Sequence, residues 1–211
     1  SGTPVVVVYI EGRPLDKRWA KANADALLTQ FYPGQQGGDA LADVLFGEFN
    51  PAGRLPVSVP YDAGQVPVYY NKKFPKGHDY VEMPSDALYP FGYGLSYTTF
   101  EYSDLKLEAL GGNQVKVSLN VKNTGKYDGE EVVQTYVTDL VASTVRPRKQ
   151  LRAFERVAVP AGETVAVEMI LDESAFIVYD RQMNPVVEPG EFTIAVGASS
   201  DDIRLKQNIT L

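Results

Sequence analysis

The sequence predicts an α/β segment, part of a parallel sheet, followed by an all-β sandwich. Residues 4–10 (PVVVVYI) form a continuous apolar run, which suits a strand buried on both faces, as in a parallel sheet. From Phe100 onward, strand patterns are separated by turn signals about every 8–12 residues, the spacing of a sandwich. The chain has 211 residues, enough for one large domain or two small ones.

The segment after the first strand continues with a short helix and a second strand. The helix is predicted at residues 16–23, with Pro14 near its start. Residues 24–31 (ADALLTQF) fit either a helix or a strand. We favour a strand, because the turn residues 32–34 (YPG) end it sharply.

A second helix is predicted at residues 39–46. Asp39 stands at its N-terminal end, where a carboxylate favours the free amides, and Gly47 stands where a C-terminal cap glycine is expected. Residues 55–60 (LPVSVP) then read as a short edge strand. This βαβαβ order implies parallel pairing with right-handed crossovers. Because three strands are too few to close a core, we expect the other strands of this sheet upstream of Ser1.

We divide the chain into three parts. Residues 1–60 are the end of an α/β domain, residues 61–99 are a loop and linker region, and residues 100–211 are an immunoglobulin-like sandwich. The loop region is rich in Tyr, Pro and Gly and holds the single histidine of the chain, His78. A loop of this length is usually functional or a domain linker. In the sandwich, we predict strands at 114–121, 132–137, 151–159, 164–171 and 191–196.

Composition excludes several classes of function. The net charge is −7 without a basic cluster, which argues against a nucleic-acid partner. There are no cysteines, so disulfides and thiolate metal sites are excluded. The run at 4–10 is far shorter than the ~20 apolar residues of a membrane span and lacks the basic start of a signal peptide. No calcium-loop spacing appears, and we expect no metal and no cofactor.

Acidic residues give no convincing catalytic pair. The pairs Glu130-Glu131, Asp172-Glu173 and Asp201-Asp202 are adjacent in the sequence, so their side chains point to opposite faces of an extended strand. We expect them on solvated edges. Glu11 directly follows the first strand, but we interpret it as a loop carboxylate.

Three local motifs are more specific. They are residues 33–47 (PGQQGGDALADVLFG), 50–56 (NPAGRLP) and 90–97 (PFGYGLSY). The glycines before Asp39 could suggest phosphate binding at a helix N-terminus, but no Gly-Lys-Ser/Thr follows them. We interpret them as a tight turn that leads into a helix.

These motifs, in this order, resemble the C-terminal part of glycoside hydrolase family 3, the β-glucosidase and β-xylosidase family. Residues up to about Ser96 are similar to the end of its α/β sandwich domain. Residues 100–211 are similar to its fibronectin type III-like domain, on segments 123–125 (NTG), 129–134 (GEEVVQ), 146–149 (RPRK) and 187–192 (VEPGEF).

The resemblance implies retaining hydrolysis of terminal, non-reducing β-D-glucosyl or related residues, in carbohydrate catabolism. Such enzymes use two carboxylates about 5–5.5 Å apart. In the family, both precede the strand that resembles residues 4–10, so we expect the nucleophile and the acid/base upstream of Ser1 and no catalytic residue in this chain. The isolated chain is therefore predicted to be inactive.

Residues of the loop region remain candidates for the rim of the substrate site. These are His78, Asp79 and Tyr80, because sugar faces stack well on aromatic rings. The His78-Asp79 pair is not taken as an acid/base dyad, because the dyad of one family subgroup lies on a barrel-domain loop. Trp19 and Tyr93 are interpreted as packed core residues.

Partners and location follow from the resemblance. We expect a barrel and the rest of the α/β domain as covalent partners, a glycoside substrate, and a homodimer of this chain if it is isolated. A periplasmic or extracellular location is favoured, and a cytoplasmic one stays open. Two alternatives also stay open: a β-xylosidase, and a stand-alone binding or adhesion module. The strand at 4–10 argues against the second, because an independent module would not begin with half of a parallel sheet.

Overall fold

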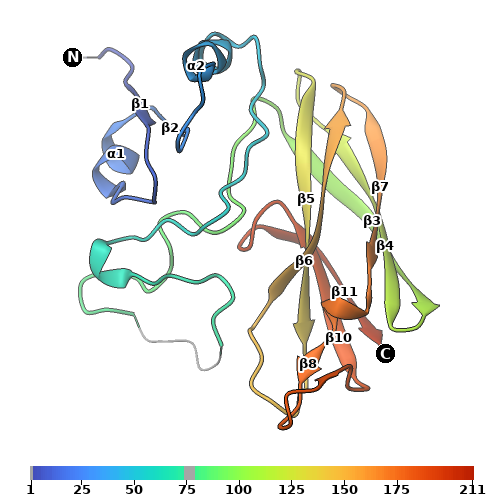
Figure 1. Ribbon diagram of the computed structural model, residues 1–211. Helices are drawn as coiled ribbons and strands as arrows, with labels where there is room; N and C mark the ends of the chain where they lie inside the picture. Colours follow the sequence, from blue (N-terminus) through green and yellow to red (C-terminus); the bar gives the residue numbers. More distant parts are fainter. Residues whose placement is uncertain (1, 74–78) are drawn as a thin grey trace.

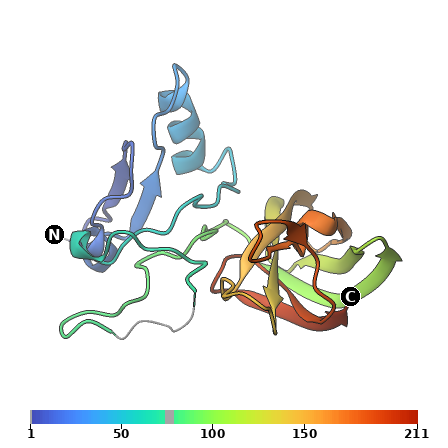
Figure 2. The same ribbon diagram turned by 60° about the horizontal axis from the view of Figure 1, so that its bottom comes forward.

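The computed structural model describes residues 2–73 and 79–211 (Figure 1). His78, one of the three predicted rim residues, lies outside this described part. A small α/β unit stands beside a β-sandwich, and the segment between α2 and β3 runs from one to the other (Figures 1 and 2).

The α/β unit is built on two parallel strands. β1 (Val6–Tyr9) pairs with β2 (Ala26–Thr29) in parallel, and α1 (Arg18–Asn23) lies between them in the sequence. The backbone amide of Val5 donates a 2.8 Å hydrogen bond to the carboxylate of Asp25, just before β2. The strand favoured for residues 24–31 is therefore confirmed, and so is the parallel pairing.

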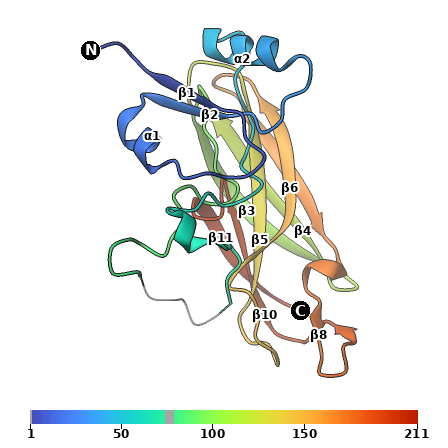
Figure 3. The same cartoon turned by 60° about the vertical axis from the view of Figure 1, so that its left-hand side comes forward.

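The second helix, α2 (Gly37–Phe46), is also confirmed and begins two residues before the predicted start. Asp39 lies in its first turn, and Gly47 ends the helix with a left-handed φ of 84°. A residue with a side chain would be strained in that conformation, which explains the glycine. Figure 3 shows α2 above one end of the sandwich strands. There the Tyr97 hydroxyl donates a 2.6 Å hydrogen bond to the Val44 carbonyl.

The edge strand predicted at residues 55–60 is wrong. This segment makes one isolated bridge, Val59 to Tyr89. Its other backbone hydrogen bonds run from Leu55 N to Tyr93 O (2.9 Å), from Gly92 N to Leu55 O (2.8 Å) and from Leu88 N to Val59 O (2.9 Å). The prolines at positions 56 and 60 have no backbone N–H to donate, so a regular ladder cannot form. The loop that follows contains one short 3₁₀ helix, η1 (Ala63–Gln65).

The sandwich has two antiparallel sheets. One has the strand order β11-β10-β5-β6 and the other β3-β4-β7. Every sandwich strand predicted from the sequence is present. The five predicted strands are β4 (Gln114–Asn123), β5 (Gly129–Asp139), β6 (Gln150–Val159), β7 (Thr164–Leu171) and β10 (Glu191–Gly197). The sheets also contain β3 (Phe100–Gly111) and β11 (Ile203–Thr210), for which no strand bounds were predicted. A short 3₁₀ helix, η2 (Glu173–Ala175), and a hairpin of β8 (Val178–Tyr179) and β9 (Pro185–Val186) lie between β7 and β10.

The core of the molecule lies between these two sheets. Strict alternation along β4 places Val115, Val117, Leu119 and Val121 inward, each at most 2% exposed. The rings of Phe176 and Phe192 meet edge to face at a centroid distance of 5.1 Å. Burial of each such side chain contributes about 1.5–3 kcal/mol, which makes this core the main source of stability.

The α/β unit is less well covered. Trp19, interpreted as a core residue, is 72% exposed, so that prediction is wrong for this chain. Tyr93, the other residue interpreted as core, is half-buried and lies 5.3 Å from the Tyr89 ring. Val6 is 45% exposed, so β1 is not buried on both faces as expected. The reason is that β2 is its single strand neighbour within the described residues.

Candidate functional site

The carboxyl ends of β1 and β2 are the first place to look for a site, because open α/β sheets bind ligands at that edge. Glu11 lies there. Both of its carboxylate oxygens are 2.6 Å from Lys17 Nζ, and the Thr29 hydroxyl donates to Oε1 at 2.7 Å. Glu11 and Lys17 are each 5% exposed. Glu11 lies in a loop, as interpreted, but its burial and its ion pair were not expected.

Neighbouring groups hold this ion pair in place. Lys17 Nζ lies 4.3 Å from the centroid of the Tyr9 ring, a cation–π contact. The Glu11 amide donates to the Phe31 carbonyl at 3.1 Å, which ties the ends of the two strands together. A general acid or base must reach a substrate atom. Glu11 instead faces Lys17 and Thr29, so its geometry is that of a structural group.

Two of the three predicted rim residues are described. The Asp79 carboxylate accepts a 2.8 Å hydrogen bond from the Ser85 amide, which closes a turn of the loop. Tyr80 is 49% exposed, so its ring is accessible.

We call the segment between α2 and β3 (residues 47–99) the linker. A second polar centre, which the sequence did not predict, joins the linker to the sandwich. Arg54 Nη2 lies 2.6 Å from Glu131 Oε2, and the Tyr102 hydroxyl donates to Glu131 Oε1 at 2.8 Å. The side chains of Arg54 and Glu131 are 8% and 2% exposed. Burial, reinforced by the Glu131 charge, raises the pKa of Tyr102 well above its ordinary value. Tyr102 therefore stays a neutral donor to this carboxylate.

This centre corrects one expectation and confirms another. Glu131 is not solvated, because it follows the inward alternation of Val133 and Val137 on β5. Its neighbour Glu130 points to the opposite face, as expected for adjacent strand residues, and pairs with Arg156 at the surface.

Gln134 makes the next contact along β5. Its Nε2 donates to the carbonyls of Gly92 (3.1 Å) and Ala198 (2.6 Å), and its Oε1 accepts from the Tyr136 hydroxyl at 2.6 Å. Gly92 has a φ of 80°, and a Cβ there would lie 2.0 Å from Gln134 Oε1. The backbone therefore approaches Gln134 closely only because this residue is a glycine.

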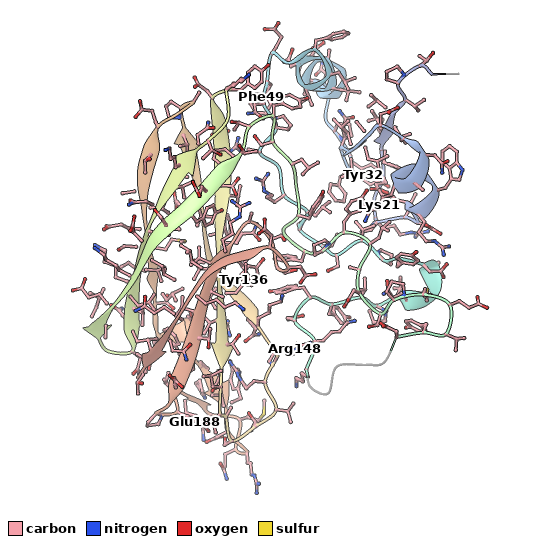
Figure 4. All side chains as sticks on the ribbon, turned by 180° about the vertical axis from the view of Figure 1, so that it is seen from behind. Lys21, Tyr32, Phe49, Tyr136, Arg148 and Glu188 are labelled. Carbon is pink, nitrogen blue, oxygen red and sulfur yellow. The ribbon has the colours of Figure 1, made fainter. Side chains whose placement is uncertain are left out.

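Aromatic contacts extend the same interface. The ring of Tyr70 stacks on Phe91 at 4.2 Å, and its hydroxyl accepts from the Leu151 amide at 3.1 Å. Figure 4 shows Tyr136 and Arg148 on the side of the sandwich that faces the linker. We call the Arg54–Glu131–Tyr102 centre together with the Gln134 and Tyr70 contacts the junction. The junction fixes the linker to the sheet β11-β10-β5-β6.

The other acidic pairs have structural roles. Asp172 accepts from the Ser174 amide at the start of η2 (2.9 Å), Asp201 pairs with Lys149 (3.0 Å), and Asp202 pairs with Arg204 (2.9 Å). Glu173 accepts from the Asn113 side-chain amide at 3.3 Å, so Glu11 and every member of the three acidic pairs has a hydrogen-bond or ion-pair partner. In the described part of the chain, no group of three or more acidic or histidine side chains could hold a metal ion. No helix among these residues is long and apolar enough to cross a membrane.

Comparison with known proteins agrees with this architecture. Residues 1–97 match the family described as "Glycosyl hydrolase family 3 C-terminal domain", and residues 131–200 match the "Fibronectin type III-like domain". The chain is 41% identical to the periplasmic β-glucosidase of Salmonella typhimurium, over 98% of this chain and 29% of that protein. It is 44% identical to a β-xylosidase of Formosa agariphila, over 97% of this chain and 30% of that protein.

Solved structures give the same result. The β-glucosidase from Listeria innocua in complex with glucose has a TM-score of 0.92 and 38% identity, and the match covers 99% of this chain and 31% of that one. A β-glucosidase from Erythrobacter marinus has a TM-score of 0.92 and 42% identity, over 98% of this chain and 28% of that one. The chain spans about 30% of the length of the curated relatives it matches. The chain therefore belongs to glycosyl hydrolase family 3, as its C-terminal α/β portion followed by a fibronectin type III-like domain.

Proposed function

We propose that this chain is the C-terminal structural part of a retaining β-glycosidase that hydrolyses terminal, non-reducing β-D-glucosyl residues. One observation carries the proposal: every carboxylate that the sequence offers as a candidate is engaged in the fold, Glu11 and Glu131 most completely. The nucleophile and the acid/base are then supplied by a preceding barrel and by the rest of the α/β domain. The names of the relatives and the share of their length that the chain covers support this assignment.

The role of the chain in such an enzyme is to hold the α/β domain and the sandwich in one arrangement through the junction. Asp79 and Tyr80 belong to the rim of the substrate site in this proposal. Tyr80 supplies an exposed ring for sugar stacking, and Asp79 shapes the loop through its bond to Ser85. A periplasmic location, as in the name of the Salmonella relative, is part of the proposal.

A second specificity, β-xylosidase, is favoured by the 44% identity to the Formosa enzyme. Xylose lacks the hydroxymethyl group of glucose, so a pocket that accommodates that group separates the two substrates. Loss of the contact between the pocket and one such carbon group changes kcat/KM by about 10–200-fold.

The test compares p-nitrophenyl β-glucoside with p-nitrophenyl β-xyloside. Each is given to the 211-residue chain alone and to the longer protein that contains it. Hydrolysis of the glucoside by the longer protein, but not by the 211-residue chain, supports the proposal. A preference of the longer protein for the xyloside selects the second specificity. Hydrolysis by the isolated chain would overturn the structural role. Inactivity of the longer protein on both would favour a binding module instead.

A further inference from the structure

A polar groove lies between the linker and the outer face of the sheet β11-β10-β5-β6. It has a volume of about 510 Å³, and its walls include Tyr69 and Lys72 from the linker and Thr138, Thr193, Ser200 and Lys206 from the sandwich. We call it the linker groove. Its size falls in the range of small-ligand sites, about 300–1,000 Å³. In Figure 4, Arg148, another lining residue, lies between the sandwich and the linker.

Two threonine hydroxyls form the floor. Thr138 on β5 and Thr193 on β10 are direct partners in the antiparallel ladder, so their side chains lie side by side on one face. Thr138 Oγ1 donates to the Arg148 carbonyl at 2.8 Å, and Thr193 Oγ1 donates to Asn208 Oδ1 at 2.9 Å. Both hydroxyl protons are therefore donated within the protein, and both hydroxyl oxygens keep lone pairs that can accept a hydrogen bond from a ligand hydroxyl. Ala195, two residues further on β10, also lines the groove, and its small side chain leaves room above the two threonines.

Ser200 adds a buried hydroxyl to the wall. The residue is 0% exposed, and its backbone is held on both sides: its amide donates to the Phe91 carbonyl at 2.9 Å, and its carbonyl accepts from Lys149 Nζ. Its Oγ is buried without a hydrogen-bond partner among the described atoms. This hydroxyl is enclosed, so it makes the wall of the groove polar without being exposed to a ligand.

The residues that line the groove carry a net positive charge, although the net charge of the chain is −7. The groove is lined by Lys72, Arg148, Lys149 and Lys206 against the two carboxylates of Asp86 and Asp201. Lys149 is paired with Asp201, and Lys72 Nζ donates to the Ser85 carbonyl at 3.1 Å. Lys206 is exposed and makes no ion pair within the described residues. Its ammonium group is therefore available to an anionic ligand.

Tyr69 supplies an apolar surface at the same groove. It is 61% exposed, while its neighbour Tyr70 is fixed by stacking on Phe91. An accessible aromatic face, clustered hydroxyls and an unpaired ammonium match the chemistry of a pyranose ring that bears a carboxylate. We propose that the linker groove is a non-catalytic binding site for a carboxylated sugar. Its ring packs on Tyr69, its hydroxyls meet Thr138 and Thr193, and its carboxylate pairs with Lys206.

This inference does not depend on hydrolysis, because none of its residues is assigned to the reaction. The test is calorimetric titration of the 211-residue chain with D-glucuronate, with D-glucose and acetate as the two partial probes. We expect glucuronate to bind more tightly than either, with an affinity that falls as salt is raised. Lys206→Ala should weaken glucuronate binding about tenfold, the usual effect of losing a charge-assisted hydrogen bond, and leave the weak glucose binding unchanged.

Controls separate the groove from the rest of the surface. Lys106→Ala removes an exposed lysine from β3, in the other sheet, and should leave glucuronate binding unchanged. Tyr69→Ala should weaken glucuronate and glucose alike. Equal affinity for glucuronate and glucose, or equal losses in Lys206→Ala and Lys106→Ala, would overturn the proposal. A failure of the longer protein to hydrolyse glycosides would leave this result untouched.

Discussion

Arg54 and Glu131 form a buried ion pair in which Nη2 and Oε2 are 2.6 Å apart, although the two residues are 77 positions apart in the sequence. Arg54 belongs to the linker motif 50–56, and Glu131 to the central strand β5 of the sandwich. Buried charges are tolerated where they are paired and hydrogen-bonded, and here Tyr102 supplies the additional hydrogen bond. The ion pair therefore anchors the linker to the interior of the sandwich.

Removal of this carboxylate should be costly. Glu131→Ala leaves the Arg54 guanidinium buried without its partner, and we expect a loss of about 3–5 kcal/mol in the free energy of unfolding. Urea denaturation of the 211-residue chain measures it. Glu130→Ala is the matched control, because the adjacent carboxylate forms a surface pair with Arg156 and should cost at most about 1 kcal/mol. Similar losses in the two variants would contradict the structural role of the buried pair.

Gly92 should tolerate no side chain. In Gly92→Ala, the new Cβ would lie 2.0 Å from Gln134 Oε1, and the alanine would have to adopt a φ of 80°. We expect a loss of about 1–3 kcal/mol, seen as a lower Tm in a thermal scan. Gly190→Ala serves as the control, because a Cβ there has nothing within 4 Å and its φ is not positive. A Gly92→Ala variant as stable as Gly190→Ala would show that the linker can move away from Gln134.

Two aspartates should affect the pH dependence of stability in opposite directions. Burial raises the pKa of Asp139 above its ordinary value of 3.8, so the folded state holds this proton more tightly than the unfolded state. The wild type therefore loses stability as pH rises from 3.8 through the folded pKa. Asp139→Asn should remove that loss and gain stability, relative to the wild type, between pH 3 and pH 7.

Asp180 is the counterpart. Hydrogen bonds from the Asn184 amide and side chain, and from the Gln182 amide, lower the pKa of Asp180 below 3.8. Its stabilising contribution is present above pH 3.8 and disappears as pH falls through the folded pKa. Asp180→Asn should thus lose stability at pH 7 and converge on the wild type in acid. Denaturation midpoints of both variants between pH 2 and pH 7 measure this, and parallel curves would refute the assignment.

The ion pair of the α/β unit makes a local prediction. Lys17→Met leaves Glu11 buried with only the Thr29 hydroxyl as a donor. We expect faster hydrogen exchange at the amides of β1 and β2, because the strand ends lose their shared anchor. Arg18→Ala removes a half-exposed side chain that pairs with Asp16 and Asp62, and should change exchange little. Unchanged exchange in Lys17→Met would mean that the buried pair does not hold this edge.

The local pattern of the chain predicts many of the regular elements, but not all of them. Alternation along residues 114–121 marks β4 correctly, because one face of that strand is buried and the other is wet. Asp39 and Gly47 mark the two ends of α2, because helix capping depends only on residues within one turn of each end. The segment 55–60 resembles a short edge strand, but its prolines remove the donors that a ladder needs.

The junction could not be predicted in this way. The burial of Glu131 depends on Arg54 and Tyr102, which no local pattern connects to it. One signal was present: Glu131 shares the inward register of Val133 on β5. The burial of Glu11 was missed for the same reason, because Lys17 and Thr29 come back to it only once the βαβ turn has formed.

The close approach of Gly92 to Gln134 has a consequence for gene architecture. A recombination event that moved only residues 100–211 into another protein would carry Glu131 and Gln134 without Arg54 and the Gly92 carbonyl. The transplanted sandwich would keep the Tyr102 and Ala198 contacts, but Glu131 would lose its ionic partner and the Gln134 amide would lose one of its two acceptors. Selection should therefore transmit the linker motifs 50–56 and 90–97 together with the sandwich as one heritable block.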